Sequence, residues 1–134
     1  MSSRAGGKLL LVVHHPGNAK VLGQAAAEIG MIAVMAATEE QLREHLTATE
    51  PAQAALVDAS GFGQGAWPLC GLLYEHGIPF VVMAAARDRE AGSRSLQCGA
   101  ASVLQKPVAK DALLKLLQTL SGQDGTSGRH DFTA

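Results

Sequence analysis

Residues 54–60, Ala54-Ala55-Leu56-Val57-Asp58-Ala59-Ser60, decide how the chain is expected to fold. An apolar run leads directly into the carboxylate of Asp58, and the glycine-rich string 61–65 follows at once. A short apolar run bounded by turn residues is typical of a strand buried on both faces of a parallel sheet. Because ligands and reactive groups gather at the carboxyl ends of such strands, Asp58 is predicted to lie at a functional edge.

The composition is that of one well-buried domain. The chain has 134 residues, of which 47% are hydrophobic and 17% charged, and its net charge is −1. This charge gives no reason to expect a nucleic acid or an anionic membrane as partner. The first apolar run, residues 8–13, is too short for a secretory signal or a membrane span. Cys70 and Cys98 fall in predicted helices and are interpreted as buried free thiols, which favours a cytoplasmic protein.

Apolar strands and amphipathic helices alternate along the chain. Strands are predicted at residues 8–13, 31–37, 54–58, 78–84 and 102–105. Helices are predicted at residues 19–29, 39–47, 67–76, 89–98 and 111–120, with Thr38 and Asp88 as N-caps and Gly30, Gly77 and Gly99 after the helix ends. Strict alternation predicts an α/β fold with a doubly wound, five-stranded parallel sheet.

The same pattern sets the domain boundaries. Residues 1–7 are expected to form an N-terminal tail, and residues 8–120 the folded domain. Residues 121–134 are rich in Gly, Ser and Thr, which predicts a flexible C-terminal tail or a linker.

In this topology the strand ends bring His14, His15, Asp58, Ala84 and Lys106 to one edge. The local sequences resemble the receiver domain of two-component response regulators across residues 8–120. The matching pieces are LVVHH (11–15), ALVDAS (55–60), IPFVVMAA (78–85) and CGAASVLQKP (98–107). The resemblance implies the (βα)5 flavodoxin-like receiver fold and a part in phosphorelay signal transduction.

Two residues keep the family's chemistry. By the resemblance, Asp58 stands at the phosphoacceptor position, and Lys106 stands where a lysine neutralises the phosphoryl oxygens. Pro107 after that lysine implies a cis peptide bond. The two retained groups have opposite charges, so we expect a standing ion pair between Asp58 and Lys106 that holds the edge in one state.

Four positions depart from the family pattern. His14 and His15 replace the acids that hold the divalent metal, Ala84 replaces the hydroxyl that binds the phosphoryl group, and Val103 replaces the switch aromatic. Mg²⁺ demands oxygen ligands, whereas imidazole suits softer metals. Phosphoryl transfer depends on neutralising charge on the phosphoryl oxygens, which Lys106 alone does incompletely. The sequence therefore predicts a degenerate site, a pseudo-receiver, that is not an enzyme and has no cofactor.

Two alternative functions remain open from the sequence. One is a functional receiver phosphorylated at Asp58, which would recruit Mg²⁺ through that carboxylate, backbone oxygens and water. The other is a small-molecule or metal sensor that uses the edge pocket around His14, His15, Asp58 and Lys106, with the two histidines and Asp58 as metal ligands.

The primary prediction is a signalling domain that acts through protein–protein contacts, with weak or no aspartyl phosphorylation. By the resemblance, the fourth helix, fifth strand and fifth helix form the docking face for a protein partner or a second copy of the chain. Arg94, Gln97, Val103 and Lys115 lie in that region. Phe62, in the glycine-rich loop, is a further candidate as an exposed anchor.

Overall fold

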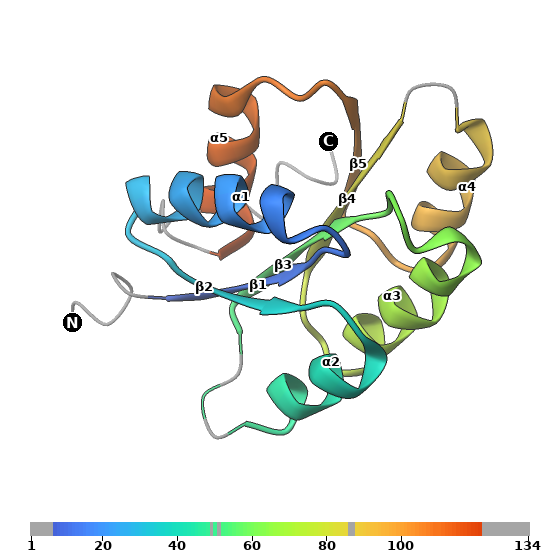
Figure 1. Ribbon diagram of the computed structural model, residues 1–134, viewed down its shortest axis with the longest axis horizontal. Helices are drawn as coiled ribbons and strands as arrows, with labels where there is room; N and C mark the ends of the chain where they lie inside the picture. The colour runs from blue at the N-terminus through green and yellow to red at the C-terminus, as the bar shows by residue number, and fades with distance from the viewer. Residues whose placement is uncertain (1–6, 49, 51, 86–87, 122–134) are drawn as a thin grey trace.

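The computed structural model describes residues 7–48, 50, 52–85 and 88–121 as one sheet with helices on both faces (Figure 1). The strands are β1 (Lys8–Val12), β2 (Ile32–Ala36), β3 (Ala54–Asp58), β4 (Phe80–Ala85) and β5 (Ser102–Lys106). The helices are α1 (Pro16–Glu28), α2 (Glu39–Leu46), α3 (Ala66–Glu75), α4 (Arg89–Gln97) and α5 (Lys110–Ser121), with a short 3-10 turn, η2 (Gly63–Gly65), before α3.

The strands are parallel and lie in the order β2-β1-β3-β4-β5. The chain therefore winds outward from β1 in one direction and from β3 in the other. The crevice at this reversal, beside the carboxyl ends of β1 and β3, is where doubly wound sheets place their ligands. The predicted α/β fold with a doubly wound, five-stranded, flavodoxin-like sheet is confirmed.

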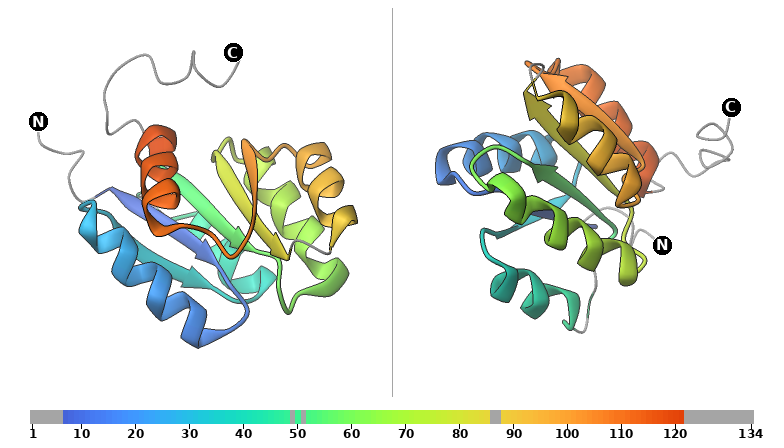
Figure 2. Two further views of the ribbon diagram at one scale, coloured as in Figure 1. Left: turned by 90° about the horizontal axis from the view of Figure 1, so that it is seen from above. Right: turned by 90° about the vertical axis from the view of Figure 1, so that its right-hand side faces the viewer.

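Two apolar cores hold the layers together, one on each face of the sheet. Helices α1 and α5 cover the first face, as the view from above shows (Figure 2). Strand residues Leu9, Leu11 and Leu56 pack there against Leu113 and Leu117 of α5. Helices α2 and α3 cover the other face. This second core includes Leu10, Val57, Phe80, Leu42 and Leu73. Alternate residues of each strand thus enter opposite cores, as the period of a pleated strand requires.

The predicted helix ends agree with the structure in most places. The hydroxyl of Thr38 accepts a hydrogen bond from the Gln41 amide at 3.1 Å. The Gln41 side chain reaches back to the amide of Ala37, one residue earlier than in the usual capping box. Asp88 caps α4 by accepting from the Ala91 amide at 3.1 Å.

Helix α1 begins earlier than the apolar pattern predicted. The expected start was Ala19, whereas the helix includes Pro16, Gly17 and Asn18. Proline suits the first helical position because its φ is already helical and its missing N–H would have no intrahelical partner there. This earlier start places Asn18 in the first turn of α1, where its side chain takes part in the site described below.

The interpretation of both cysteines as buried thiols holds for one of them. Cys70 lies in the core under α3, and burial, with a smaller contribution from Cys98, raises the pKa of its thiol to about 12. Cys98 is the C-cap residue of α4 and is only partly buried. A residue at a helix end has fewer packed neighbours than one at a helix centre. The sequence pattern therefore predicted more burial for Cys98 than the structure shows.

Among the described residues, no helix is long and apolar enough to cross a membrane. Except for Gly7 and Ser121, the predicted N-terminal and C-terminal tails lie outside the described residues.

The contribution of packing at the central strand, β3, can be tested by mutation. Leu56 is fully buried between β1 and β4, so Leu56→Ala is expected to lower the free energy of unfolding by about 3 kcal/mol through lost burial and a cavity. Ile32→Ala, at a strand position that is 60% exposed, should cost less than about 1 kcal/mol. Urea unfolding of both variants measures the difference. Equal losses would contradict this account of the core.

Candidate functional site at the carboxyl edge of the sheet

The site is built on the last residue of the central strand. Residues 54–58 are all buried, and the Asp58 residue is only 1% exposed. A carboxylate in such a place loses most of its hydration, so the charge must be compensated by neighbouring groups. The arrangement of the edge follows from this requirement.

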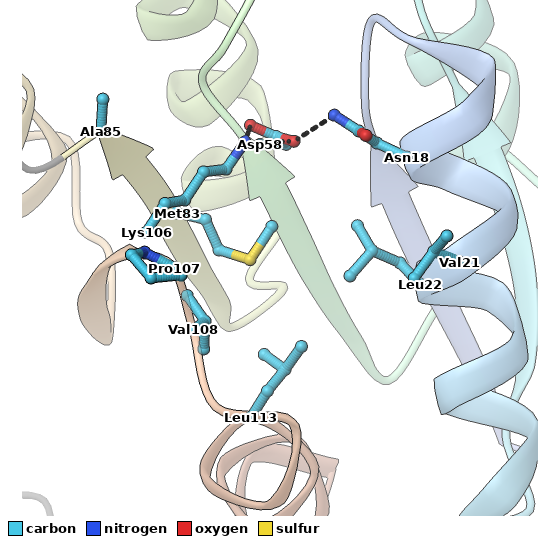
Figure 3. A pocket seen from close by; sticks show the side chains of 10 residues that line it. All are labelled: Asn18, Val21, Leu22, Asp58, Met83, Ala85, Lys106, Pro107, Val108 and Leu113. Carbon is cyan, nitrogen blue, oxygen red and sulfur yellow. Dashed lines mark hydrogen bonds and ion pairs between the residues drawn. The ribbon is translucent and has the colours of Figure 1, made fainter.

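Three donors satisfy the Asp58 carboxylate. The Lys106 Nζ atom lies 2.7 Å from Oδ1 and 2.9 Å from Oδ2. The backbone amide of Ser60 donates to Oδ1 at 3.0 Å, and the side-chain amide of Asn18 donates to Oδ2 at 3.2 Å. Figure 3 shows Lys106 and Asn18 approaching the carboxylate from opposite sides. The predicted ion pair between Asp58 and Lys106 is confirmed.

The Lys106 ammonium is satisfied in turn. Besides both carboxylate oxygens, it donates to the Ser60 hydroxyl at 3.0 Å. An ammonium has three hydrogens, so these three acceptors match its full donor capacity. The pair is therefore a closed, internally neutral unit.

Asn18 and Ser60 are site residues that sequence reasoning did not identify. Ser60 lies two residues after Asp58, and its amide bond to that carboxylate is the Asx-turn pattern, which was a usable signal. Asn18 donates a hydrogen bond to the Asp58 carboxylate, although it lies 40 residues earlier in the sequence. Its role depends on α1 starting at Pro16, and the expected later start placed Asn18 in a loop.

The two histidines lie in the exposed loop between β1 and α1. The rings of His14 and His15 meet edge to face with centroids 5.0 Å apart, and His14 also meets the Phe62 ring at 5.5 Å. Phe62 is partly buried against the core, so the expectation of an exposed anchor is wrong. Gly61 has a φ of +88°, and a Cβ there would come within 2.7 Å of His15, so the loop requires glycine.

The predicted metal ligands do not form a set. Within the part of the chain that the structure describes, no three His, Cys, Asp or Glu side chains come together as a metal site needs. His14, His15 and Asp58 are therefore not gathered around one point. The remaining donors also fit Mg²⁺ poorly, because imidazole is a soft ligand and the Asp58 oxygens already accept from Lys106, Asn18 and Ser60.

The other predicted positions lie on β4 and β5. Ala84 is buried, 3% exposed, and lies opposite Gln105 of β5. Val103 is half-buried on the edge strand β5. The Lys106–Pro107 peptide bond is cis, as predicted.

The closed pair predicts an asymmetric response to mutation. Lys106→Met would leave Asp58 buried without its cation, so the free energy of unfolding should fall by about 2–3 kcal/mol. Adding Asp58→Asn should restore much of that loss, because the neutral amide keeps an acceptor for Ser60. Lys110→Met, which removes an exposed ion pair with Glu28, is the matched control and should cost less than about 1 kcal/mol. Denaturant unfolding measures all three. A double variant no more stable than Lys106→Met alone would refute the buried-charge explanation.

The sequence and the fold of the chain can be compared with those of known proteins. No family model matches the chain, and no curated protein matches it. A response regulator from Thermotoga maritima has 18% identity and a TM-score of 0.75, covering 87% of this chain and 98% of its own. The signal receiver domain of a histidine kinase from Syntrophus aciditrophicus has 22% identity and a TM-score of 0.77, covering 91% and 95%.

A third solved structure has a metal in the corresponding fold. The receiver domain of a sensor histidine kinase from Pseudomonas aeruginosa, with a magnesium ion coordinated in its active-site cleft, has 24% identity and a TM-score of 0.70. It covers 88% of this chain and 99% of its own. The described part of this chain has the fold of a receiver domain.

Proposed function

We propose that the chain is an atypical response-regulator receiver domain, a pseudo-receiver, that works through protein–protein contacts with weak or no phosphorylation of Asp58. The observation that carries this proposal is the closed unit of Asp58, Lys106, Asn18 and Ser60. A phosphoacceptor carboxylate must offer an oxygen to the incoming phosphorus, and here both oxygens already accept hydrogen bonds.

The surroundings of the pair support the same proposal. Transfer of a phosphoryl group needs positive charge and donors directed at its oxygens. Lys106 is committed to Asp58 and Ser60, while His14 and His15 offer nitrogen where a hard cation needs oxygen. Ala84 has no hydroxyl to donate to a phosphoryl oxygen. The edge is thus better suited to holding one fixed state than to switching or to catalysis.

A phosphodonor experiment tests the proposal. The full chain is incubated with Mg²⁺ and acetyl phosphate, and its intact mass is measured. We expect no stoichiometric phosphoryl adduct, because the described residues gather no set of acidic ligands for Mg²⁺ at this carboxylate and both of its oxygens already accept hydrogen bonds. The triple variant His14→Asp/His15→Asp/Ala84→Thr restores oxygen ligands and the hydroxyl, and should gain an Mg²⁺-dependent adduct.

Adding Asp58→Asn to the triple variant is the control, and it should remove the adduct. A stoichiometric adduct on the wild-type chain that disappears in Asp58→Asn would instead establish the functional phosphoacceptor. In that case the proposed signalling role would be retained, and the proposal that it is independent of phosphorylation would be rejected.

We further propose that the docking face comprises α4, β5 and α5. Leu96 of α4 is 58% exposed, and Gln97 of α4 and Lys115 of α5 are also exposed. Arg94 is less available, since it pairs with Glu90 and its guanidinium lies 5.5 Å from the centre of the Trp67 ring. An exposed leucine amid polar side chains is the composition of a modest interface. The proposed occupant is a second copy of the chain.

Self-association tests this face. Leu96→Asp should abolish concentration-dependent dimerisation in analytical ultracentrifugation, because it places a charge in the apolar centre of the contact. Ile32→Asp, at a position 60% exposed on β2, is the matched control and should leave dimerisation unchanged. A wild-type chain that is monomeric at every concentration, or equal effects of both variants, would rule out the face.

A further inference from the structure

A cavity of about 690 Å³ opens beside the Asp58–Lys106 pair. Helix α1 forms one wall with Val21 and Leu22. The opposite wall comes from Pro107 and Val108, which follow β5, and from Leu113 of α5 (Figure 3). Met83 and Ala85 of β4 complete the lining. Neither histidine of the β1–α1 loop is among the lining residues, so this cavity differs from the histidine pocket expected from the sequence.

The size and lining of the cavity are those of a small-molecule site. Such sites measure roughly 300–1,000 Å³ and combine mostly apolar walls with a few polar groups. Among the described lining residues the polar ones are Asn18, Asp58 and Lys106, and all three lie at the end where the central strand stops. On the wall formed by α1, Val21 is 64% exposed, so an apolar surface faces the opening.

The hydrogen bonds at the polar end define which head group fits. Asp58 and Lys106 neutralise each other, and the donors of Lys106 are all used. An anionic ligand would have to compete with Asp58 for the ammonium, and a cationic one with Lys106 for the carboxylate. Asn18 donates one hydrogen to Asp58, and its carbonyl oxygen has no hydrogen-bond partner among the described residues. The uncommitted groups at this end are thus neutral: the Asn18 carbonyl oxygen as an acceptor and the second hydrogen of its amide nitrogen as a donor.

We propose that this cavity binds an uncharged, largely apolar small molecule that carries one hydrogen-bond donor, with the donor at Asn18 and the apolar body between α1 and α5. This site goes beyond the proposed function and does not depend on it, because ligand binding there requires neither the phosphorylation state of Asp58 nor a protein partner, although Asp58, Lys106 and Leu113 of α5 are among the lining residues. Its ligand would rest against the closed ion pair without opening it.

A matched pair of fluorescent probes tests the inference on the full chain. N-phenylnaphthylamine is neutral, apolar and carries one N–H donor, and anilinonaphthalene sulfonate has the same ring system with an added anionic group. We expect saturable, blue-shifted emission from the neutral probe at one site per chain. The sulfonate should bind at least about tenfold more weakly, because Lys106, the cation among the described lining residues, is already paired with Asp58.

Two variants and one spectrum locate the binding. Val21→Asp places a carboxylate on the exposed wall and should weaken the neutral probe at least about tenfold. Ile32→Asp, at a position of β2 that is 60% exposed and outside the cavity, should bind as wild type does. Methyl NMR shifts induced by the probe should concentrate on Val21, Leu22, Met83, Val108 and Leu113. Unchanged melting temperatures of the variants show that the fold is retained.

Each opposing result overturns the inference. Absence of saturable binding would mean that the cavity does not hold this class of molecule. Equal affinity for both probes would contradict selection for a neutral ligand. Shifts centred elsewhere, or loss of binding in Ile32→Asp but not in Val21→Asp, would assign the probe to another surface. None of these results bears on the phosphodonor experiment, so the two proposals fail separately.

Discussion

A carboxylate with almost no access to water stands at the end of the central strand, and the edge of the sheet is organised to compensate it. Asp58 is held by Lys106 from 48 residues away and by Asn18 from 40 residues away, so one charge joins β3 to β5 and to α1. A buried ion pair contributes little net stability compared with apolar packing, yet loss of either partner is costly. Its main effect is therefore to fix one geometry at this edge.

We assign different roles to the cavity and to the docking face. The closed pair and the cavity lie on the side covered by α1 and α5, as the shared lining of Leu22, Met83 and Leu113 shows. Helix α4 packs beside α3 and the ends of β4 and β5. Strand β5 contributes to both surfaces, because Lys106 ends it and its outer edge is unpaired in the sheet. The proposed ligand site and the proposed docking face would therefore share β5 and α5.

Much of the fold was predictable, because apolar runs and caps are local signals. The strand before Asp58, the Thr38 and Asp88 caps and the Asp58–Lys106 pair all follow from short patterns read within one topology. Asn18 was missed, since the periodicity of apolar residues does not reveal that Pro16 begins the helix. The half-burial of Phe62 depends on its contact with His14, which lies on another loop. The apolar cavity also depends on how α1 and α5 are spaced, and no local pattern encodes that distance.

The contact between Arg94 and Trp67 gives the molecule an optical property. Trp67 is the single tryptophan of the chain, and it lies at the start of α3 beneath a guanidinium from α4. Its indole N–H is buried and has no hydrogen-bond partner among the described residues, so its emission is sensitive to any water or other acceptor that enters. Steady-state fluorescence of the unlabelled protein thus reports on the contact between α3 and α4.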